Sequence, residues 1–358
     1  MELLSEGAVK PPLGQGEEDP GDTGPDQVSQ MAEARVSIVI PNLNGEAFIR
    51  PCLDAVRVQT GISPRVIVID NGSTDGSDKI VRDEYPECEL IRFETNTGFC
   101  GAVNAGIKAS EDMDYVILLN NDTVIDPAFT YELVKAIEED DRIFSCQARM
   151  LSMADPSVID DAGDLYCALG WAFARGKGKK DGPKYRKKRE IFASCAGAAI
   201  YRVSILKEIG AFDEVHFAYL EDTDIGWRAR IKGYRNIYAP DAVVKHVGSA
   251  SSGSIYNLFK VRNSSRNSVY IIGKNMPLLM VIINLPFLIP GFLIKTLFFA
   301  LKGYGKDYVT GIGKGFALSA GSGKTGKKVP FAFKEAGAHL KIQLDLWVNL
   351  VRRLMEAL

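Results

Sequence analysis

Short apolar runs alternate with amphipathic segments from Arg35 to about Val247. The runs are rich in β-branched and aliphatic residues, which is typical of buried strands, and the segments between them have helical spacing. We expect strands at 36–40, 66–69, 89–93 and 115–119. We expect helices at about 46–57, 77–84 and 98–109, and a further helix beginning near Pro127. This alternation predicts an α/β fold, with a mainly parallel sheet, helices on both faces, and ligands at the carboxyl ends of the strands.

The chain changes character after about Ala250. Residues 277–294 are apolar except for Asn284, and Lys295 follows them. This run only just reaches the length of a membrane span, and Pro286 and Pro290 would kink it. We expect a helix in the membrane interface, with a true span and a buried helix of a soluble domain as alternatives. Lysines 302, 306, 314, 324, 327 and 328 come next, as expected beside anionic headgroups, and 333–358 predicts another amphipathic helix.

The composition excludes several classes of protein. The 358 residues are 46% hydrophobic and 25% charged, so the chain can bury a sizeable core and is not fully disordered. The six cysteines are scattered without a CxxC pair, which argues against a disulfide scaffold or a zinc module and favours a reducing cytosol. The first residues show no signal-peptide pattern.

Charge divides the chain into three parts, although the formal net charge is only −2. Residues 1–34 hold eight acids, one lysine and four prolines, and we expect a disordered acidic tail. Residues 35–250 hold the α/β pattern. Residues 251–358 hold fifteen Lys and Arg against four acids, and we expect a helical, membrane-associating region. Its positive charge suits an anionic partner, either lipid headgroups or a phosphorylated substrate.

Polar residues follow two of the predicted strands at the same edge of the sheet. Asp70 comes after the second strand, beside a glycine-rich turn, where a carboxylate can accept hydrogen bonds from a base or ribose. Asn120, Asn121 and Asp122 follow the fourth strand, and an aspartate there can hold Mg²⁺ or Mn²⁺ together with phosphate oxygens. The alternative for both sites is an ordinary polar turn before a helix.

Three further groups of polar residues are candidates. Asn96, Gly98 and Asn104 flank a helix start whose free N–H groups either face a nucleotide or simply cap the helix. Glu221, Asp222 and Asp224 open another helix, where close carboxylates suit either a general base or compensation of the helix dipole. His246 ends a predicted strand and is either structural or a metal ligand.

Residues 175–189 contain nine Lys and Arg and one Asp. We expect a solvated loop there, with a lid over phosphates as the alternative. A nucleic-acid surface is disfavoured, because Tyr185 is the one aromatic residue among these charges. We therefore expect no nucleic-acid partner.

Taken together, six motifs in this order and spacing resemble family 2 glycosyltransferases of the GT-A fold, in the rhamnosyltransferase-like branch. The motifs are VSIVIPNLNG (36–45), VIDNGSTDGS (68–77), NTGFCGAVNAG (96–106), LLNNDTVI (118–125), CAGAAIYRVSILKEIGAFDE (195–214) and FAYLEDTDIGWRARIKGY (217–234). The resemblance covers residues 35–250 and implies that these form a GT-A catalytic domain.

The resemblance implies a role for each candidate residue. It assigns the binding of the donor nucleotide to Pro41, Asn44, Asp70, Asn96, Gly98, Asn104 and Asn121, and Asp70 would bind the pyrimidine base. The metal site falls to Asp122 and His246, with Asn120 where the family motif has its first Asp. The general base is Asp222, paired with Glu221. Support of the diphosphate or acceptor falls to Trp227 and Arg228.

The implied reaction is an inverting, metal-dependent transfer from a UDP- or dTDP-sugar to a hydroxyl of a glycan or lipid-linked acceptor, in surface polysaccharide or glycolipid assembly. The implied cofactor is Mg²⁺ or Mn²⁺. We expect peripheral or monotopic attachment to the cytoplasmic face of an anionic membrane. The sequence leaves open whether the chain forms a homo-oligomer. The alternatives are a sugar nucleotidylyltransferase, whose glycine-rich loop is replaced here by Asn42, Leu43, Asn44 and Gly45, or a non-catalytic nucleotide-sugar or lipid-binding module.

Overall fold

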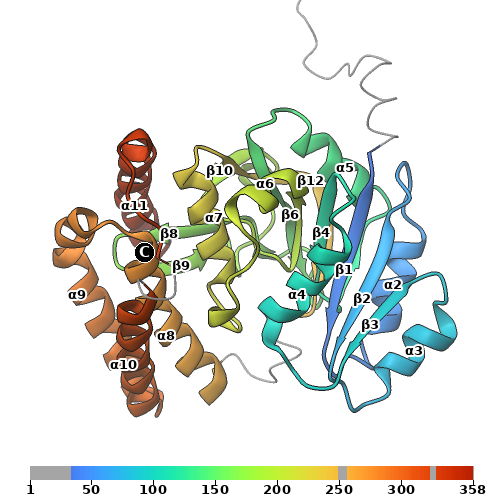
Figure 1. The fold of residues 1–358 in the computed structure, drawn as a ribbon, viewed down its shortest axis with the longest axis horizontal. Helices are drawn as coiled ribbons and strands as arrows, with labels where there is room; N and C mark the ends of the chain where they lie inside the picture. Colours follow the sequence, from blue (N-terminus) through green and yellow to red (C-terminus); the bar gives the residue numbers. More distant parts are fainter. Residues whose placement is uncertain (1–33, 249–255, 323–327, 358) are drawn as a thin grey trace, which may run out of the picture.

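The computed structural model describes residues 34–248, 256–322 and 328–357. One large sheet forms the middle of the molecule, and helices from the C-terminal part of the chain lie along one side of it (Figure 1). The predicted disordered tail lies outside the described residues except for Ala34, and so do Lys324 and Lys327 of the predicted basic segment.

The strands of the large sheet lie in the order β10-β12-β6-β11-β4-β1-β2-β3, with β5 and β7 paired at its side. Their bounds are β1 Val36–Asn42, β2 Arg65–Asn71, β3 Glu89–Phe93, β4 Tyr115–Leu119, β5 Thr123–Ile125, β6 Ile143–Ser152, β7 Ile159–Asp161, β10 Arg189–Ile191, β11 Ala198–Arg202 and β12 Arg235–His246. A separate hairpin joins β8 (Asp164–Cys167) to β9 (Trp171–Ala174).

The four strands predicted from the sequence form the parallel half of the sheet. Strands β3, β2, β1 and β4 are neighbours and all run in one direction. Strand β11 then runs antiparallel to both β4 and β6, and β12 returns parallel to β6. The prediction of a mainly parallel sheet is confirmed for the half of the sheet that contains these four strands, whose carboxyl ends carry Asp70 and Asn120.

The helices are α2 Ile49–Arg57, α3 Ser77–Glu84, α4 Gly98–Ala109, α5 Phe129–Ile137, α6 Val203–Ile209, α7 Glu221–Ile231, α8 Leu258–Asn275, α9 Leu278–Leu301, α10 Gly305–Ser322 and α11 Ala336–Ala357. Alternate residues of each strand pack on opposite faces of the sheet. Ile38 and Ile40 of β1 join the core under α2, α3 and α5, whereas Val39 joins the core under α4, α6 and α7. Helices therefore cover both faces, as predicted.

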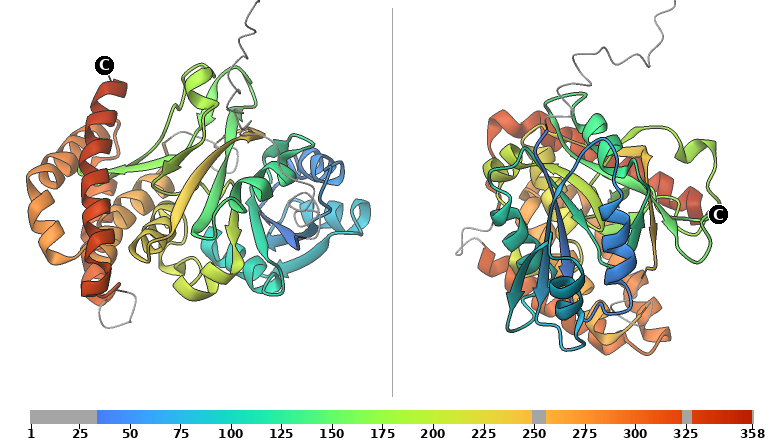
Figure 2. Two further views of the ribbon diagram at one scale, coloured as in Figure 1. Left: turned by 90° about the horizontal axis from the view of Figure 1, so that it is seen from above. Right: turned by 90° about the vertical axis from the view of Figure 1, so that its right-hand side faces the viewer.

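The C-terminal helices pack on the sheet domain rather than standing apart from it. A shared core joins Trp227 of α7 and Tyr166 of β8 to Ile271 of α8 and Leu346 of α11. The hairpin β8–β9 reaches from the sheet toward α11, as Figures 1 and 2 show. The described residues after 256 are mainly helical, as predicted, and they bury apolar surface against the sheet domain.

Helix α9 runs unbroken from Leu278 to Leu301 through Pro286, Pro290 and Lys295. It is long and apolar enough to cross a membrane by length and composition, and only 22% of its most apolar window is buried within the described residues. One stripe of the helix, which includes Asn284 and Leu288, faces the protein. The opposite side exposes large apolar side chains, so the described packing does not make α9 a buried core helix.

Candidate active site

Asp70 lies at the carboxyl end of β2, directly beside Asn42 of β1 in the strand register. Its carboxylate accepts a 3.3 Å hydrogen bond from Asn42 Nδ2 and lies 3.5 Å from Arg92 Nε. Asn42 Oδ1 in turn accepts a 2.7 Å bond from Asn121 Nδ2, so polar groups after β1, β2 and β4 meet in one network. Asp70 is fully buried, so direct contact with a nucleotide base requires its neighbours to move.

The turn after β1 is built against the turn after β2. Asn44 has a left-handed φ of 51°, its backbone N–H donates to Ser73 Oγ, and its side-chain oxygen accepts from the N–H of Thr74. At Gly45, an added Cβ would lie 2.1 Å from Asn121 Nδ2, which explains a glycine there. Pro41 pairs with Ile69 at the end of β1. These contacts bring Pro41, Asn44 and Asn121 to the sheet edge where the sequence predicts the donor.

The remaining predicted donor residues have mostly structural contacts. Asn96 is bonded to Asn71 at the end of β2, and its Oδ1 accepts from the N–H of Gly98 at the start of α4. A Cβ on Gly98 would lie 2.6 Å from the carbonyl oxygen of Phe217, so the glycine lets α4 approach the segment before α7. The amide of Asn104 bonds to the backbone N–H and carbonyl of Phe212. Asn104 thus ties α4 to the segment after α6 and does not join the Asp70 network.

Asp122 and His246 come together, as the sequence predicts for a metal site. His246 Nε2 lies 3.3 Å from Asp122 Oδ1, and its Nδ1 lies 2.7 Å from Asp160 Oδ2. Burial disfavours the imidazolium, yet the two carboxylates outweigh this effect and raise the pKa of His246 to about 9. Lys177 Nζ contacts the other oxygen of Asp160 at 2.7 Å. Burial opposes ionisation of Asp160, but His246 and Lys177 lower its pKa to about 2.

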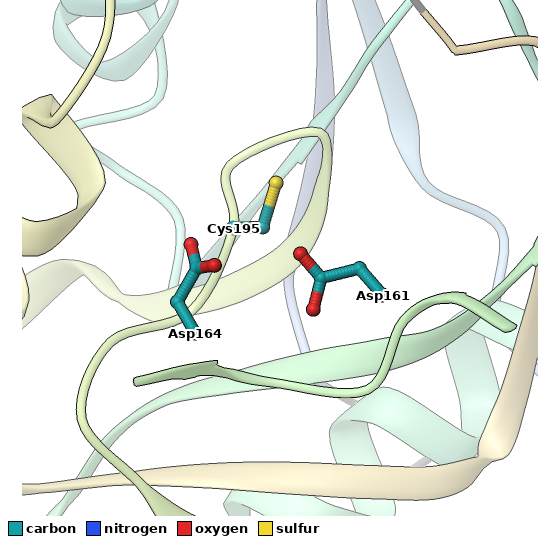
Figure 3. A group of neighbouring side chains, drawn as sticks. All are labelled: Asp161, Asp164 and Cys195. Atoms are coloured by element: carbon teal, nitrogen blue, oxygen red, sulfur yellow. The ribbon is translucent and has the colours of Figure 1, made fainter. Parts of the chain in front are cut away.

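Asp161, Asp164 and Cys195 point toward one another next to this site (Figure 3). Their ligand atoms all lie within 4.8 Å of one another. Burial raises the pKa of Asp161 to about 6, although Gln147 Nε2 and the N–H of Gly163 each donate to its carboxylate at 2.8 Å. Burial and the charge of Asp161 raise the pKa of Asp164 well above its ordinary value. Burial and mutual repulsion therefore make both acids bind protons more tightly than ordinary aspartates do.

The two predicted catalytic acids lie in the first turn of α7. Asp222 Oδ1 accepts a 3.2 Å bond from the N–H of Ala196, and burial together with the charge of Glu221 raises the pKa of Asp222 well above its ordinary value. Burial, with the charge of Asp164, raises the pKa of Glu221 to about 7, and its Oε2 is buried without a hydrogen-bond partner among the described residues. Glu221 is thus poised to exchange a proton near neutral pH, and Asp222 binds its proton more tightly than an ordinary aspartate does.

The segment before α7 has a strained backbone. Phe217, Tyr219 and Leu220 all have positive φ angles, of 61°, 74° and 67°, which non-glycine residues rarely adopt. Asn267 of α8 holds this segment, because its Nδ2 donates to the carbonyl oxygens of His216, Ala218 and Tyr219 at 3.0, 3.0 and 2.7 Å. A side chain from the C-terminal region thus fixes the backbone that positions Glu221 and Asp222.

A buried ionic network also connects α7 to α8. Lys274 Nζ contacts Asp213 Oδ2 at 2.7 Å and Asp224 Oδ2 at 2.8 Å. Asp224 further accepts from Arg228 Nε at 2.9 Å and from Asn275 Nδ2 at 2.8 Å. Burial opposes the charge on both acids, but Lys274 outweighs it and lowers the pKa of Asp213, and it lowers that of Asp224 strongly.

Trp227 and Arg228, which the sequence predicts to support the diphosphate or acceptor, are held by contacts within the protein. Trp227 is fully buried between Tyr166 and Phe192, with ring centroids 5.2 and 5.3 Å away. Beyond its pairing with Asp224, Arg228 donates to the carbonyl oxygens of residues 209–211, at the end of α6. These contacts bury both side chains in this structure, and their role toward a ligand stays a prediction.

The basic segment 175–189 is ordered along much of its length. Arg175 is buried over the ring of Tyr185, and Pro183–Tyr185 forms a 3₁₀ helix. Lys177 is the residue that reaches the acids, through Asp160. The expectation of a solvated loop is therefore wrong for Arg175 and Tyr185. Closure of the segment 175–189 over a donor stays a hypothesis.

A cavity of about 280 Å³ lies beside the acids of α7 and β8. Asp164, Asp222 and Thr223 line it on one side, and Ser264 and Ser268 of α8 contribute hydroxyl groups. Sequence reasoning missed Asp160, Asp161 and Asp164, because strands β7 and β8 are too short for a clear pattern. The signal was the acid run Asp160-Asp161-Ala162-Gly163-Asp164 directly after Ile159.

Comparisons with known proteins agree with this fold. Residues 37–210 match the family model described as glycosyl transferase family 2. The chain is 29% identical over 213 residues to N-acetylglucosaminyl-diphospho-decaprenol L-rhamnosyltransferase of Mycobacterium tuberculosis, covering 52% of this chain and 68% of the relative. It is 25% identical over 217 residues to O-antigen chain rhamnosyltransferase RfbN of Salmonella typhimurium, covering 59% and 66%.

Two solved structures share the fold. S. aureus TarS in complex with UDP-GlcNAc superposes with a TM-score of 0.54 at 18% identity, covering 80% of this chain and 81% of that one. GalNAc-T7 with UDP, GalNAc and Mn²⁺ gives 0.53 at 15% identity, covering 67% of this chain and 47% of its own length. The predicted GT-A architecture with added C-terminal helices is confirmed at the level of the fold.

Proposed function

We propose that this chain, which carries a glycosyl transferase family 2 domain over residues 37–210, moves a sugar from a UDP- or dTDP-sugar to a hydroxyl of a lipid-linked or glycan acceptor. The observation that carries the proposal is the pairing of Asp122 with His246, next to a series of interacting acids that leads from Asp160 through Asp161 and Asp164 to Asp222. The rhamnosyltransferase relatives support a place in surface polysaccharide assembly.

The proposed donor site is the network around Asp70, Asn42 and Asn121. Pro41 and Asn44 supply its outer turn, and Asn96 closes the end of β2. In this proposal Asn42 and Arg92 contact the Asp70 carboxylate until a base N–H replaces one of them. Asn104 and Gly98 support this network by fixing the position of α4 against the segments around Phe212 and Phe217.

Asp122 and His246 fit a divalent cation. One ion could contact Asp122 Oδ1 and His246 Nε2, which lie 3.3 Å apart, while Asp160 holds the opposite ring nitrogen. A carboxylate behind a metal-binding histidine is the usual arrangement for fixing its ring. Mg²⁺ or Mn²⁺ bound there would supply positive charge to the departing diphosphate. The positions of Asp122 and His246 support metal dependence, and the ion itself stays a proposal.

Asp222 is the proposed general base. Its raised pKa makes it a stronger proton acceptor than an ordinary carboxylate. The acceptor hydroxyl gives its proton to Asp222, its oxygen forms a bond to the anomeric carbon, and the bond from that carbon to the diphosphate oxygen breaks. The nucleoside diphosphate leaves with the electron pair, and this single displacement inverts the anomeric centre. Glu221 would share the proton with Asp222.

The C-terminal helices are proposed to rest on the cytoplasmic face of an anionic membrane. Helices α9 and α11 both expose large apolar side chains, among them Leu278, Leu301, Leu340 and Met355. Residues 251–358 also carry the surplus of Lys and Arg. Exposed apolar side chains beside basic residues favour the interface of an anionic bilayer. This placement would bring the α7 acids close to a lipid-linked acceptor.

Asp222→Asn in the full-length chain tests the function. Nucleoside diphosphate release from UDP- and dTDP-sugars is followed in the presence of Mn²⁺ and lipid-linked acceptors. We expect the variant to lose at least about 100-fold in transfer, the lower range for removal of a general base. Asp112→Asn, an exposed acid outside the site, is the matched control and should keep full activity. Equal turnover by wild type and Asp222→Asn would remove Asp222 from the mechanism.

A further inference from the structure

Lys295 is the single charged residue of the apolar helix α9, and it faces the protein. The buried stripe of α9 runs through Asn284, Leu288, Gly291 and Phe299, and the partly buried Lys295 lies on the same side, one turn after Gly291. Its Nζ lies over the ring of Trp171 in β9, 5.3 Å from the centroid. A cation placed inside the apolar contact of a helix needs a counter-charge to offset its loss of hydration.

Among the described residues, no carboxylate forms an ion pair with Lys295. Cys167 of β8 and Arg353 of α11 are the groups that act on Lys295 electrostatically, and Arg353 is a second cation. Arg353 in turn stacks over Phe173, the neighbouring aromatic residue of β9, at 5.6 Å. Two positive side chains therefore lie over two aromatic rings of β9, and within the described part of the chain neither forms an ion pair with a carboxylate.

Lys295 also lines the 280 Å³ cavity that contains Asp164 and Asp222. Neither Asp122 nor His246 lines this cavity, so Lys295 opens onto the acceptor side of the proposed base rather than onto the proposed metal site. The cavity is small for a ligand pocket and has room for a polar head, so a lipid chain would lie outside it. Leu293, Ile294 and Leu297 of α9 are more than half exposed within one turn of Lys295, on the outer side of the helix.

We propose that Lys295, assisted by Arg353, binds the phosphate or diphosphate that links the acceptor sugar to its lipid, while the hydroxyl to be glycosylated lies at Asp222. This inference rests on the proposed glycosyl transfer and adds to it the recognition of the acceptor. The anion supplies the missing counter-charge, and the outer side of α9 receives the hydrocarbon chain. A neutral glycan would leave Lys295 without this partner, so the cavity selects acceptors with a negative charge next to the sugar.

Trp171 fluorescence in the full-length chain, in a non-ionic detergent, tests the binding step. Geranyl diphosphate is the probe, and geraniol, inorganic diphosphate and phosphatidylglycerol vesicles are the comparisons. Trp171→Phe identifies which part of the emission belongs to Trp171. We expect geranyl diphosphate to change this emission at concentrations at least about tenfold lower than geraniol. Lys295→Met should weaken binding at least about tenfold, whereas Lys302→Met, at the exposed end of the same helix, should bind as wild type does.

Several results would overturn the inference. One is equal binding of geranyl diphosphate by Lys295→Met and wild type. Another is equal binding of geraniol and geranyl diphosphate by wild type. A third is a response to phosphatidylglycerol vesicles alone, which would indicate a site for a lipid headgroup. Displacement of geranyl diphosphate by UDP would place Lys295 in the donor site. Failure of the proposed function gives a different result, namely no turnover of any nucleotide sugar by wild type, with Lys295-dependent binding intact. In transfer assays, Lys295→Met should raise the KM for a diphosphate-linked acceptor and leave the KM for the donor unchanged.

Discussion

Replacement of Lys274 by methionine should strongly destabilise the whole chain. Lys274 is almost completely buried and contacts two buried carboxylates, Asp213 at 2.7 Å and Asp224 at 2.8 Å. Methionine has a similar length, so the change removes the charge with little change in volume. Breaking a buried ion pair from one side costs about 3–5 kcal/mol, because a charge remains without compensation.

The remaining contacts place the effect of Lys274→Met near the lower end of that range. Asp224 keeps Arg228 and Asn275, and Asp213 keeps the hydroxyl of Tyr270 at 2.8 Å and the N–H of Val215 at 3.2 Å. We therefore expect a loss of about 3 kcal/mol in the free energy of unfolding. This is a large fraction of the roughly 5–15 kcal/mol that stabilises a typical domain.

Urea unfolding followed by circular dichroism measures this loss. Lys341→Met is the matched control, because Lys341 pairs with Glu190 at 2.8 Å but is 58% exposed, and such a pair contributes at most about 1 kcal/mol. Asp213→Asn in the Lys274→Met background should recover part of the loss, since the amide removes one of the two negative charges that Lys274 compensates. A Lys274→Met chain no less stable than Lys341→Met would refute the reasoning.

The effect of Lys274→Met should also depend on pH in one direction. Lys274 lowers the pKa of Asp213, so their pairing stabilises the fold above the ordinary aspartate pKa of about 3.9. As the pH falls below that value, the carboxylate becomes protonated and the pairing is lost. The stability difference between wild type and Lys274→Met should therefore be complete at neutral pH and shrink in acid.

Three further predictions concern the site. Asn267→Ala removes the donor to three carbonyl oxygens before α7. We expect kcat to fall at least about tenfold, with the KM for the donor unchanged. A variant that loses stability but keeps kcat would contradict a positioning role for Asn267. Asp160→Asn should lower the pKa of His246 from about 9 in an NMR titration without metal, and an unchanged pKa would rule out their coupling. In the pH profile of the transfer rate, the midpoint of the fall on the acid side should lie well above the ordinary pKa of an aspartate, because the pKa of Asp222 is raised. A midpoint near pH 4 would contradict this environment of Asp222.

Where the periodicity is strong, the sequence predicts the elements closely. The expected helices 77–84 and 98–109 and the strands 89–93 and 115–119 coincide with α3, α4, β3 and β4. Helix α2 begins at Ile49 rather than at Glu46, because residues 46–48 form a turn after Gly45. Apolar runs bounded by turn residues carry this information locally.

The middle of the chain could not be predicted in the same way. Strands β7 and β8 have only three or four residues, too few to show a period, yet they carry Asp161 and Asp164 to the site. Asn267 and Lys274 lie in a helix whose polar residues face inward, toward the segment before α7. Their role depends on contacts with residues about fifty positions earlier, and no local pattern encodes such contacts.

These same contacts make the boundary near residue 250 a change in composition rather than a point where the chain can be cut. A chain that ends there would leave Asp213 and Asp224 without Lys274, and the carbonyls of His216, Ala218 and Tyr219 without Asn267. It would also expose the core that Trp227 and Tyr166 share with Ile271 and Leu346. We therefore expect residues 35–250 alone to unfold or aggregate, as measured by circular dichroism and light scattering. A stable, active fragment would show that the α8 contacts are dispensable for positioning Asp222, and membrane binding could then be assigned to the C-terminal helices by truncation.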